Sequence, residues 1–368
     1  MNARLRATLL AAVLFVAFVG VLIAQPTGYM RLSPGPTTDV LAANLTMKNN
    51  PSYIQIKGHK SYPDTDGQLR MLTVYEMGPG QTLSLASAIG NWLRDDTSVY
   101  PEEFWHPAGT TQEQSNQQGA AQMASSQDLA RAAGLRAAGF KVPEHQQIEL
   151  VDVDSQGPAR GIIKSGDVVV SVDGKPMASS DAFVKEIGRY HPGDKISMVV
   201  KRAGKKVPVT ITAGAKGTSG AAAQQARIGV SVGQAQKFDF PFTIKFNLDA
   251  NIEGSSAGMM FSLAIYDLLT PGSLTDGHVV AGTGTIGSDP KDINKVGPIG
   301  GIAQKIKGAQ NAGAELFLAP AANCDEVVRA HYDHDSMRIV KVATLQDALK
   351  AITTWTADPH AALPGCSS

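Results

Sequence analysis

Two serines lie between glycines in the stretch NIEGSSAGMMFSLAIYDLL, residues 251–269, where an apolar run typical of a helix begins. The first turn of a helix has free N–H groups and the positive end of the helix dipole. A serine hydroxyl at that point lies beside donors suited to an oxyanion, which is the arrangement that acyl transfer requires. Serine is also a preferred N-cap residue. On this stretch alone, Ser256 is therefore either a nucleophile or a helix cap.

A nucleophilic serine needs a base, and the residues that follow offer a histidine and a lysine. His278 lies in TDGHVVAG, at a turn before a predicted strand, with no acidic partner evident in the sequence. Lys305 and Lys307 lie in a helix predicted after VGPIGG. At ~100° per residue they point about 200° apart, so we expect one of them to face inward. Burial lowers the pKa of a lysine, and a neutral amine can accept the serine proton. Taken alone, Lys305 would be interpreted as a surface lysine.

The elements around these residues alternate between strands and helices over residues 226–356. The predicted strands are RIGVSVG, FTIKFNL, HVVAGTGTI and AELFLAP, and the predicted helices are SAGMMFSLAIYDLLT, GIAQKIKGAQNAG and LQDALKAITTW. This order indicates an α/β or α+β domain. The preceding residues 30–125 begin with the turn-rich RLSPGPTTDVL and continue in short alternating stretches of the strand type. Their polar end, residues 107–126, is rich in Gln, Gly and Ser and predicts a loop or linker.

A separate unit is expected at residues 127–214. It opens with a helix that Gly139 would end and contains GIIKSGDVVVSVDGKPM, followed by further helix and strand patterns. This motif resembles that of bacterial PDZ domains. The resemblance implies β-rich structure and capture of extended peptides by β-augmentation. It also places a carboxylate-binding loop near Gly139 and Phe140. A β-rich spacer without a ligand is the alternative.

Three motifs of the last block occur together in one order. EGSSAG with a helix behind it, then GTGTI, then GPIGGIAQKIKGAQNAGAELFLAP closely resemble the proteolytic domain of Lon-type proteases. The resemblance implies a catalytic dyad of Ser256 and Lys305, with Thr283 as the hydrogen-bonding partner of the lysine. Two residues depart from the family pattern: Ser255 stands where proline is common, and Thr285 stands where an acidic residue is common.

Together, the motifs resemble membrane-anchored, PDZ-containing Lon-like serine proteases of bacteria. The fold implied is α+β: a Lon-type proteolytic domain of mixed α/β structure with an inserted β-rich PDZ domain, after an N-terminal transmembrane helix. The activity implied is that of a serine endopeptidase acting on unfolded or extended polypeptides. No phosphate loop of the form G-x-x-x-x-G-K-[ST] occurs, so ATP is not an expected partner. The family's tendency to form rings makes a homo-oligomer one possible assembly, and the sequence does not reveal the oligomeric state.

The N-terminus predicts a membrane helix. Residues 7–24 carry no charge, span about 27 Å as a helix and follow Arg4 and Arg6. A cleaved signal peptide is the alternative, although Leu22 stands where a cleavage site prefers a small residue. The two arginines place residues 1–6 in the cytoplasm and the rest outside it. Outside, Cys324 and Cys366 can form one disulfide or stay unpaired.

Composition excludes other classes of function. The chain has 33 Lys plus Arg and 33 Asp plus Glu, and it lacks a basic stripe interleaved with aromatics, so nucleic acid is not an expected partner. The segment HYDHD, residues 331–335, could hold a metal, but a solvated turn is the simpler interpretation. We therefore expect no metal or cofactor, and we expect residues 357–368 to form a tail. The alternative to an enzyme is a membrane-anchored peptide-binding PDZ scaffold without catalysis, and retention of both Ser256 and Lys305 argues against it.

Overall fold

The computed structural model describes residues 3–63, 66–154, 156–202, 205–217, 224–249, 251–289 and 291–366. The chain divides into two compact units, the first made of Met1–Val142 with Phe240–Ser368 and the second of Pro143–Asp239. The second unit is thus inserted into the first. It begins and ends later along the chain than the range 127–214 expected from sequence, because a helix up to residue 137 packs on the first unit. The segment 215–226, the N-terminal residues 1–6 and the tail 357–368 lie partly outside the described residues.

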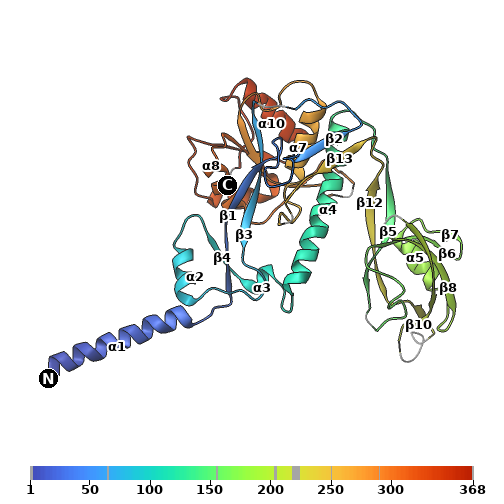
Figure 1. Ribbon diagram of the computed structural model, residues 1–368, viewed down its shortest axis with the longest axis horizontal. Coiled ribbons are helices and arrows are strands. Elements are labelled where there is room, and N and C mark those ends of the chain that lie inside the picture. The colour runs from blue at the N-terminus through green and yellow to red at the C-terminus, as the bar shows by residue number, and fades with distance from the viewer. Residues whose placement is uncertain are drawn as a thin grey trace. The chain divides into compact units, whose positions relative to one another are not determined.

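A six-stranded mixed sheet forms the centre of the first unit (Figure 1). Its strands in spatial order are β18 (Arg338–Val342), β17 (Leu316–Pro320), β14 (Val279–Gly282), β3 (Gln68–Glu76), β1 (Tyr29–Asp39) and β4 (Ser98–Pro101). The strands β18, β17, β14 and β3 run parallel, and β1 pairs antiparallel with both β3 and β4. The short pairs of the unit are β2 (Ile54–Lys57) with β13 (Thr243–Phe246), and β15 (Thr285–Ile286) with β16 (Val296–Gly297).

Helices cover this sheet through the alternating residues of its strands. The helices of the unit are α1 (Ala3–Ala24), α2 (Leu85–Trp92), α3 (Glu102–Trp105), α4 (Gln112–Ala137), α7 (Gly258–Leu269), α8 (Ile302–Asn311), η1 (Ala321–Asn323), α9 (Cys324–Arg329) and α10 (Leu345–Ala357). Ala281 and Phe317 share a buried cluster with Ile302 and Ile306 of α8. Gly282, on the opposite face of β14, leaves room for Met260 of α7, whose sulfur lies 2.8 Å from where a Cβ would be. The site-bearing helices α7 and α8 therefore pack around the end of β14.

The polar stretch 107–126 was expected to be a loop, and the structure corrects this interpretation. Most of it belongs to α4, which begins after a capping box in which Thr111 and Gln114 bond each other's backbone N–H groups. The N-terminal half of the helix is largely exposed and therefore lacks the apolar periodicity that marks a helix in sequence. At its other end, Gly139 has a φ of +87° and follows the last turn, as the sequence predicted.

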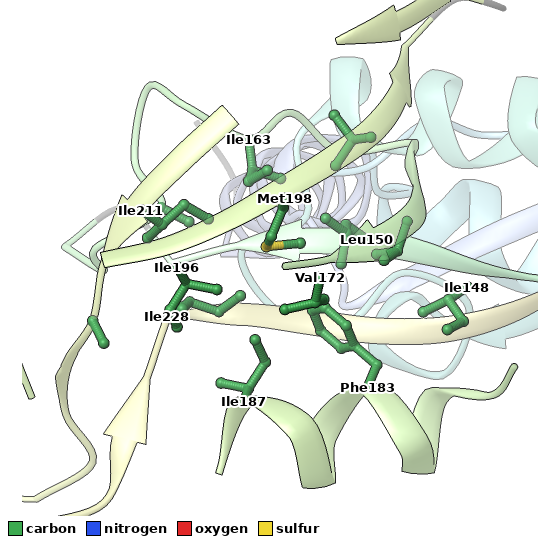
Figure 2. Close-up of a cluster of buried hydrophobic side chains, with 14 of the residues drawn as sticks. Ile148, Leu150, Ile163, Val172, Phe183, Ile187, Ile196, Met198, Ile211 and Ile228 are labelled. Atoms are coloured by element: carbon green, nitrogen blue, oxygen red, sulfur yellow. The ribbon is translucent and has the colours of Figure 1, made fainter. Parts of the chain in front are cut away.

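The second unit is a β-rich domain with one helix. Its strands are β5 (Glu144–Val153), β6 (Asp167–Val172), β7 (Lys175–Pro176), β8 (Lys195–Arg202), β9 (Lys205–Thr212), β10 (Gly214–Ala215), β11 (Ala226–Arg227) and β12 (Val230–Phe238). The main sheet has the order β12-β5-β6-β8-β9. Figure 2 shows Phe183 and Ile187 of helix α5 (Ser180–Ile187) pointing into the core beside Val172 and Ile196. The strand β12 lies at the edge of the sheet.

Helix α1 is long and apolar enough to cross a membrane. Its span Arg4–Ala24 has a mean hydropathy of 2.8, and none of it is buried against the rest of the chain. Length and composition alone support this reading, since an N-terminal signal sequence has the same properties. The structure thus confirms the predicted apolar helix and leaves open whether it is retained.

Cys324 and Cys366 form a disulfide, so the first of the two alternatives left open by the sequence is the one observed. It joins the start of α9 to the C-terminal segment across 42 residues of chain. Closing a loop of that length in the unfolded state corresponds to about 4 kcal/mol in the chain-entropy model. The bond lies next to the buried cluster under α8, because Cys366 packs against it.

We expect the double variant Cys324→Ala/Cys366→Ala to lower the free energy of unfolding of the first unit by about 3–4 kcal/mol. Urea denaturation followed by tryptophan fluorescence measures the change, because Trp355 is buried in this unit. Reduction of the unmodified protein is the control and should produce a similar loss. An unchanged midpoint in both experiments would mean that the bond contributes nothing to stability.

Candidate active site

Ser256 lies in a loop that α4 holds in place. The backbone N–H of Gly254 donates to the carbonyl of Gly119 at 3.1 Å, and Ser126 Oγ donates to the carbonyl of Ser255 at 3.1 Å. Gly254 has a φ of +86°, which a residue with a Cβ rarely adopts. Helix α7 has Ala257 as its N-cap, and no side-chain capping bond is present there. The hydroxyl of Ser256 therefore does not cap the helix.

Backbone donors suited to an oxyanion lie next to this hydroxyl. Within the described ranges, the N–H groups of Ser256 and Ala257 have no hydrogen-bond acceptor, whereas the N–H of Gly258 donates to the carbonyl of Ser255 at 3.3 Å. Both free groups precede the first turn of α7, where the helix dipole is positive. Such donors stabilise the negative oxygen of a tetrahedral intermediate.

Lys305 reaches Ser256 from helix α8. Its Nζ lies 2.6 Å from Ser256 Oγ, and its side chain is only 2% exposed. Gly301, the N-cap of α8, has a φ of +69° and sets the direction in which the helix leaves the preceding loop. Burial lowers the pKa of Lys305 to about 7. At neutral pH a large share of this lysine is thus uncharged, as a general base must be.

Thr283 completes a closed hydrogen-bond triangle. It follows the last residue of β14, and its Oγ1 lies 3.1 Å from Lys305 Nζ and donates to the carbonyl of Ser256 at 3.1 Å. The carbonyl of Ser256 also accepts from the N–H of Gly284 at 2.8 Å. A single threonine hydroxyl thus positions the lysine and the backbone of the serine together.

We expect Thr283→Val to lower kcat/KM about 10- to 100-fold with little change in KM. The valine keeps the shape but loses the hydrogen bond to the lysine. The lysine becomes charged as it takes the serine proton, and a hydrogen bond to a charged group is worth roughly 1.5–3 kcal/mol. Steady-state cleavage of a fluorogenic peptide measures the effect. Thr283→Ser restores the hydroxyl and should recover most of the rate. If the valine variant retained the full rate, Thr283 would have no positioning role.

The other residues considered from sequence lie elsewhere. His278 precedes β14, at the opposite end from Thr283, and its Nδ1 lies 3.0 Å from Glu315 Oε2. The acidic partner that the sequence did not reveal thus exists, but it holds the histidine away from Ser256. In the segment 331–335, the rings of Tyr332 and His334 contact each other. Among the described residues, no group of three or more His, Cys, Asp or Glu is placed to hold a metal ion.

A cleft of about 1110 Å³ opens in front of the triangle. It is lined by the β3 residues after Met71, by α4 between Ser115 and Met123, and by residues 251–257. The pairing of β3 with β14 ends at Met71, whereas its pairing with β1 continues to Glu76. Among the residues that the structure describes, no strand therefore pairs with this edge of β3 where it faces the cleft, and sequence patterns alone did not reveal this free edge.

The second unit contains a groove of about 520 Å³ between α5 and β12. Val184 and Ile187 line it on the helix side, and Ile228, Gly229 and Val230 line it on the strand side. The predicted location of a carboxylate-binding loop near Gly139 and Phe140 is wrong. Phe140 lies in the first unit, where its ring packs against His59 and Phe242. The loop that leads into the groove strand instead comes late in the chain, just before β12.

Comparison with known families identifies two domains in the chain. Residues 249–354 match the family model described as Lon protease (S16) C-terminal proteolytic domain, and residues 127–213 match the model described as PDZ domain. The chain therefore carries a Lon-type proteolytic domain and a PDZ domain. The Lon-type domain is that of a serine peptidase with a Ser-Lys dyad. The mixed α/β architecture and the two-domain organisation expected from the motifs are confirmed.

Curated relatives match only part of this chain. Lon protease 2 of Bacillus subtilis is 30% identical over 114 residues, which is 31% of this chain and 19% of the relative. A probable periplasmic serine endoprotease DegP-like of Halomonas elongata is 39% identical over 101 residues, 25% of this chain and 21% of the relative. The chain thus spans about a fifth of the length of either protein. The PDZ domain of the SdrC-like protein from Listeria innocua is similar at 24% identity, with 23% of this chain and 92% of that domain covered and a TM-score of 0.21.

Proposed function

We propose that this protein is an ATP-independent serine endopeptidase that cleaves unfolded or extended polypeptides outside the cytoplasmic membrane. One observation carries the proposal: Lys305 Nζ, buried and with its pKa lowered to about 7, lies 2.6 Å from Ser256 Oγ. A surface lysine or a capping serine would not require this arrangement. The geometry is that of a nucleophile beside its general base.

The reaction would proceed by acyl transfer. Ser256 Oγ attacks the peptide carbonyl while neutral Lys305 takes the hydroxyl proton, and the N–H groups of Ser256 and Ala257 bind the developing oxyanion. Lys305 then gives that proton to the leaving amine as the C–N bond breaks, which leaves an acyl-enzyme. A water molecule, deprotonated by Lys305, attacks the ester, and the proton returns to Ser256 Oγ as the ester bond breaks.

The free edge of β3 supports an extended polypeptide as the substrate. A chain that adds to this edge as a strand gains backbone hydrogen bonds independent of its sequence. Most of the backbone of a folded domain is already hydrogen-bonded within that domain and is not available to add in this way. The chain also has no phosphate loop with which to power unfolding by ATP. Substrates would therefore be already unfolded.

The PDZ groove supports a role in selecting these substrates. The strand β12 lies at the edge of its sheet and lines the groove from Val230 to Val232, and α5 supplies an apolar wall, so an extended peptide fits between them. The location outside the membrane is supported by the apolar helix α1 behind Arg4 and Arg6, together with a disulfide in the catalytic unit. The resemblance to ring-forming proteases implies a homo-oligomer, which light scattering of the detergent-solubilised protein tests.

Cleavage of casein by the full-length protein in detergent, without nucleotide, tests the proposed activity. We expect cleavage that added ATP and Mg²⁺ do not accelerate. The variant Val184→Glu places a charge in the PDZ groove at a residue that is 57% exposed, so the fold should survive. It should slow casein cleavage but not cleavage of a short peptide. No cleavage of either substrate, by a protein shown to be folded, would favour the peptide-binding scaffold instead.

A further inference from the structure

The short helix α2 exposes its apolar face. Ile89, Trp92 and Leu93 lie within one stripe of the helix, and their exposed fractions are 49%, 75% and 72%. The buried side of the helix is provided by Ala88, a much smaller residue. Ser84 caps the helix through a bond from the N–H of Ser87, so the helix is well defined. Soluble proteins normally place large apolar side chains inward. A helix that instead exposes its large apolar side chains indicates an interaction surface.

The first residue of α2 lies close in space to the last residues of α1. The N–H of Leu85 donates to the carbonyl of Gln25 at 3.0 Å, and the N–H of Thr27 donates to the carbonyl of Leu83 at 2.8 Å. Gln25 itself directly follows the last residue of α1. The two helices are in contact, and Figure 1 shows them side by side at this junction. The exposed stripe is therefore tied to the exit of the apolar span.

The dimensions place this stripe at the surface of a bilayer. An α-helix of eight residues is about 12 Å long, and the headgroup layer on each side of the hydrocarbon core is about 5–8 Å thick. Because α2 starts at the exit of α1, its side chains lie within reach of that layer. Tryptophan is enriched there, since its ring is amphipathic, and leucine and isoleucine insert beside it.

We propose that α2 is a second membrane contact, lying on the outer leaflet with Ile89, Trp92 and Leu93 inserted at the interface. The proposal rests on the proposed function in one respect: α1 must be retained as the membrane anchor. The charges that follow the stripe do not select anionic lipid, because Arg94 pairs with Asp96 and Asp95 adds a negative charge. A zwitterionic phosphatidylcholine surface is thus the partner.

This contact would also hold the catalytic unit close to the membrane. The chain continues from α2 into β4, where Ser98 Oγ accepts a hydrogen bond from Gln304 Nε2 at 2.6 Å. Gln304 is buried and immediately precedes Lys305 on α8. The interfacial helix is therefore linked to the catalytic unit by a short and well-bonded segment, and it would restrict how the cleft faces the membrane.

Fluorescence quenching by brominated phosphatidylcholine tests the proposal with the full-length protein in liposomes. The chain has three tryptophans, Trp92, Trp105 and Trp355. We expect a large quenched fraction in the unmodified protein, which Trp92→Phe removes and Trp105→Phe retains. Trp105 is a matched control, because its indole N–H bonds Glu76 and its ring lines the cleft. Equal quenching before and after Trp92→Phe would overturn the proposal.

Extraction with alkaline carbonate distinguishes the interfacial role of α2 from the anchoring of the protein by α1. Protein that resists extraction but shows no Trp92 quenching keeps α1 as an anchor and refutes the interfacial role of α2. Protein that is released by carbonate refutes both. If Trp92 emission is blue-shifted yet unaffected by brominated lipid, a second copy of the chain covers the stripe, and the proposal is likewise overturned.

Discussion

Replacing Ser256 by alanine is expected to lower kcat for casein and for short peptides at least about 10³-fold. The hydroxyl lies 2.6 Å from Lys305 Nζ, and removing a nucleophile from such a unit leaves only the contribution of the oxyanion site and of binding. Substrate binding should persist, because the cleft and the PDZ groove are unchanged. Single-turnover cleavage and peptide binding by fluorescence anisotropy measure the two effects separately.

Ser255→Ala provides the matched control for this substitution. The structure uses the carbonyl of Ser255, which accepts from Ser126 Oγ, and this carbonyl is retained in the variant. Its activity should stay within about threefold of the unmodified protein. Activity in Ser256→Ala comparable to that of Ser255→Ala would remove Ser256 from the role of nucleophile.

Replacing Lys305 by methionine is expected to abolish cleavage and, at the same time, to stabilise the fold. Methionine has a similar length and needs no hydrogen bond, so it suits a side chain that is 2% exposed. The unfolded lysine binds a proton readily, whereas burial lowers the pKa of the folded lysine from 10.5 to about 7. The lysine therefore costs the folded state a few kcal/mol at neutral pH, and the variant avoids this cost.

The lowered pKa of Lys305 fixes the direction in which stability and activity change with pH. Between pH 7 and 10.5 the unfolded protein binds more protons at Lys305 than the folded protein, so the stability due to this group rises with pH. The stabilising effect of Lys305→Met should be greatest at or below pH 7 and vanish towards pH 10.5. The activity of the unmodified protein should rise with pH around 7, because the neutral amine is the base. Urea midpoints and kcat/KM across pH 6–9 measure both trends.

An unfolding midpoint lowered by Lys305→Met at pH 7 would contradict this account. It would mean that the lysine is charged in the folded protein and stabilised by a partner that the geometry does not reveal. Ser256→Ala is the appropriate comparison for stability, because it removes the hydrogen-bond partner of Lys305 but keeps the buried amine. The two variants should therefore differ in stability although both are inactive.

The sequence predicted that Ser256, Thr283 and Lys305 lie together, because each resides in a short motif. These motifs contain glycines, and the structure brings Lys305 Nζ within 3.1 Å of the hydroxyls of both Ser256 and Thr283. The sequence also predicted that one of Lys305 and Lys307 faces inward, and in the structure the buried one is Lys305. The assignment of catalytic roles to these residues stays a prediction for the variants above to test.

What sequence could not show depends on partners distant along the chain. The polar first half of α4 lacks an apolar stripe, so its helical state rests on a local cap and on contact with α7. The sequence predicted a groove loop before the first strand of the PDZ domain. The strand β12, which lines the groove, instead comes after β9 and pairs back to β5. Pairing of strands 80 residues or so apart leaves no periodic signal in either segment.

The insertion points of the second unit lie next to each other on the first. Phe140 shortly precedes the departure of the chain and Phe242 shortly follows its return, and the centroids of their rings are 5.3 Å apart. A few glycines could therefore close the gap without stretching either side. The peptide-recognition module is in this sense removable and replaceable. Exchanging only the inserted domain at this junction would change which substrates are selected and leave the catalytic unit unchanged.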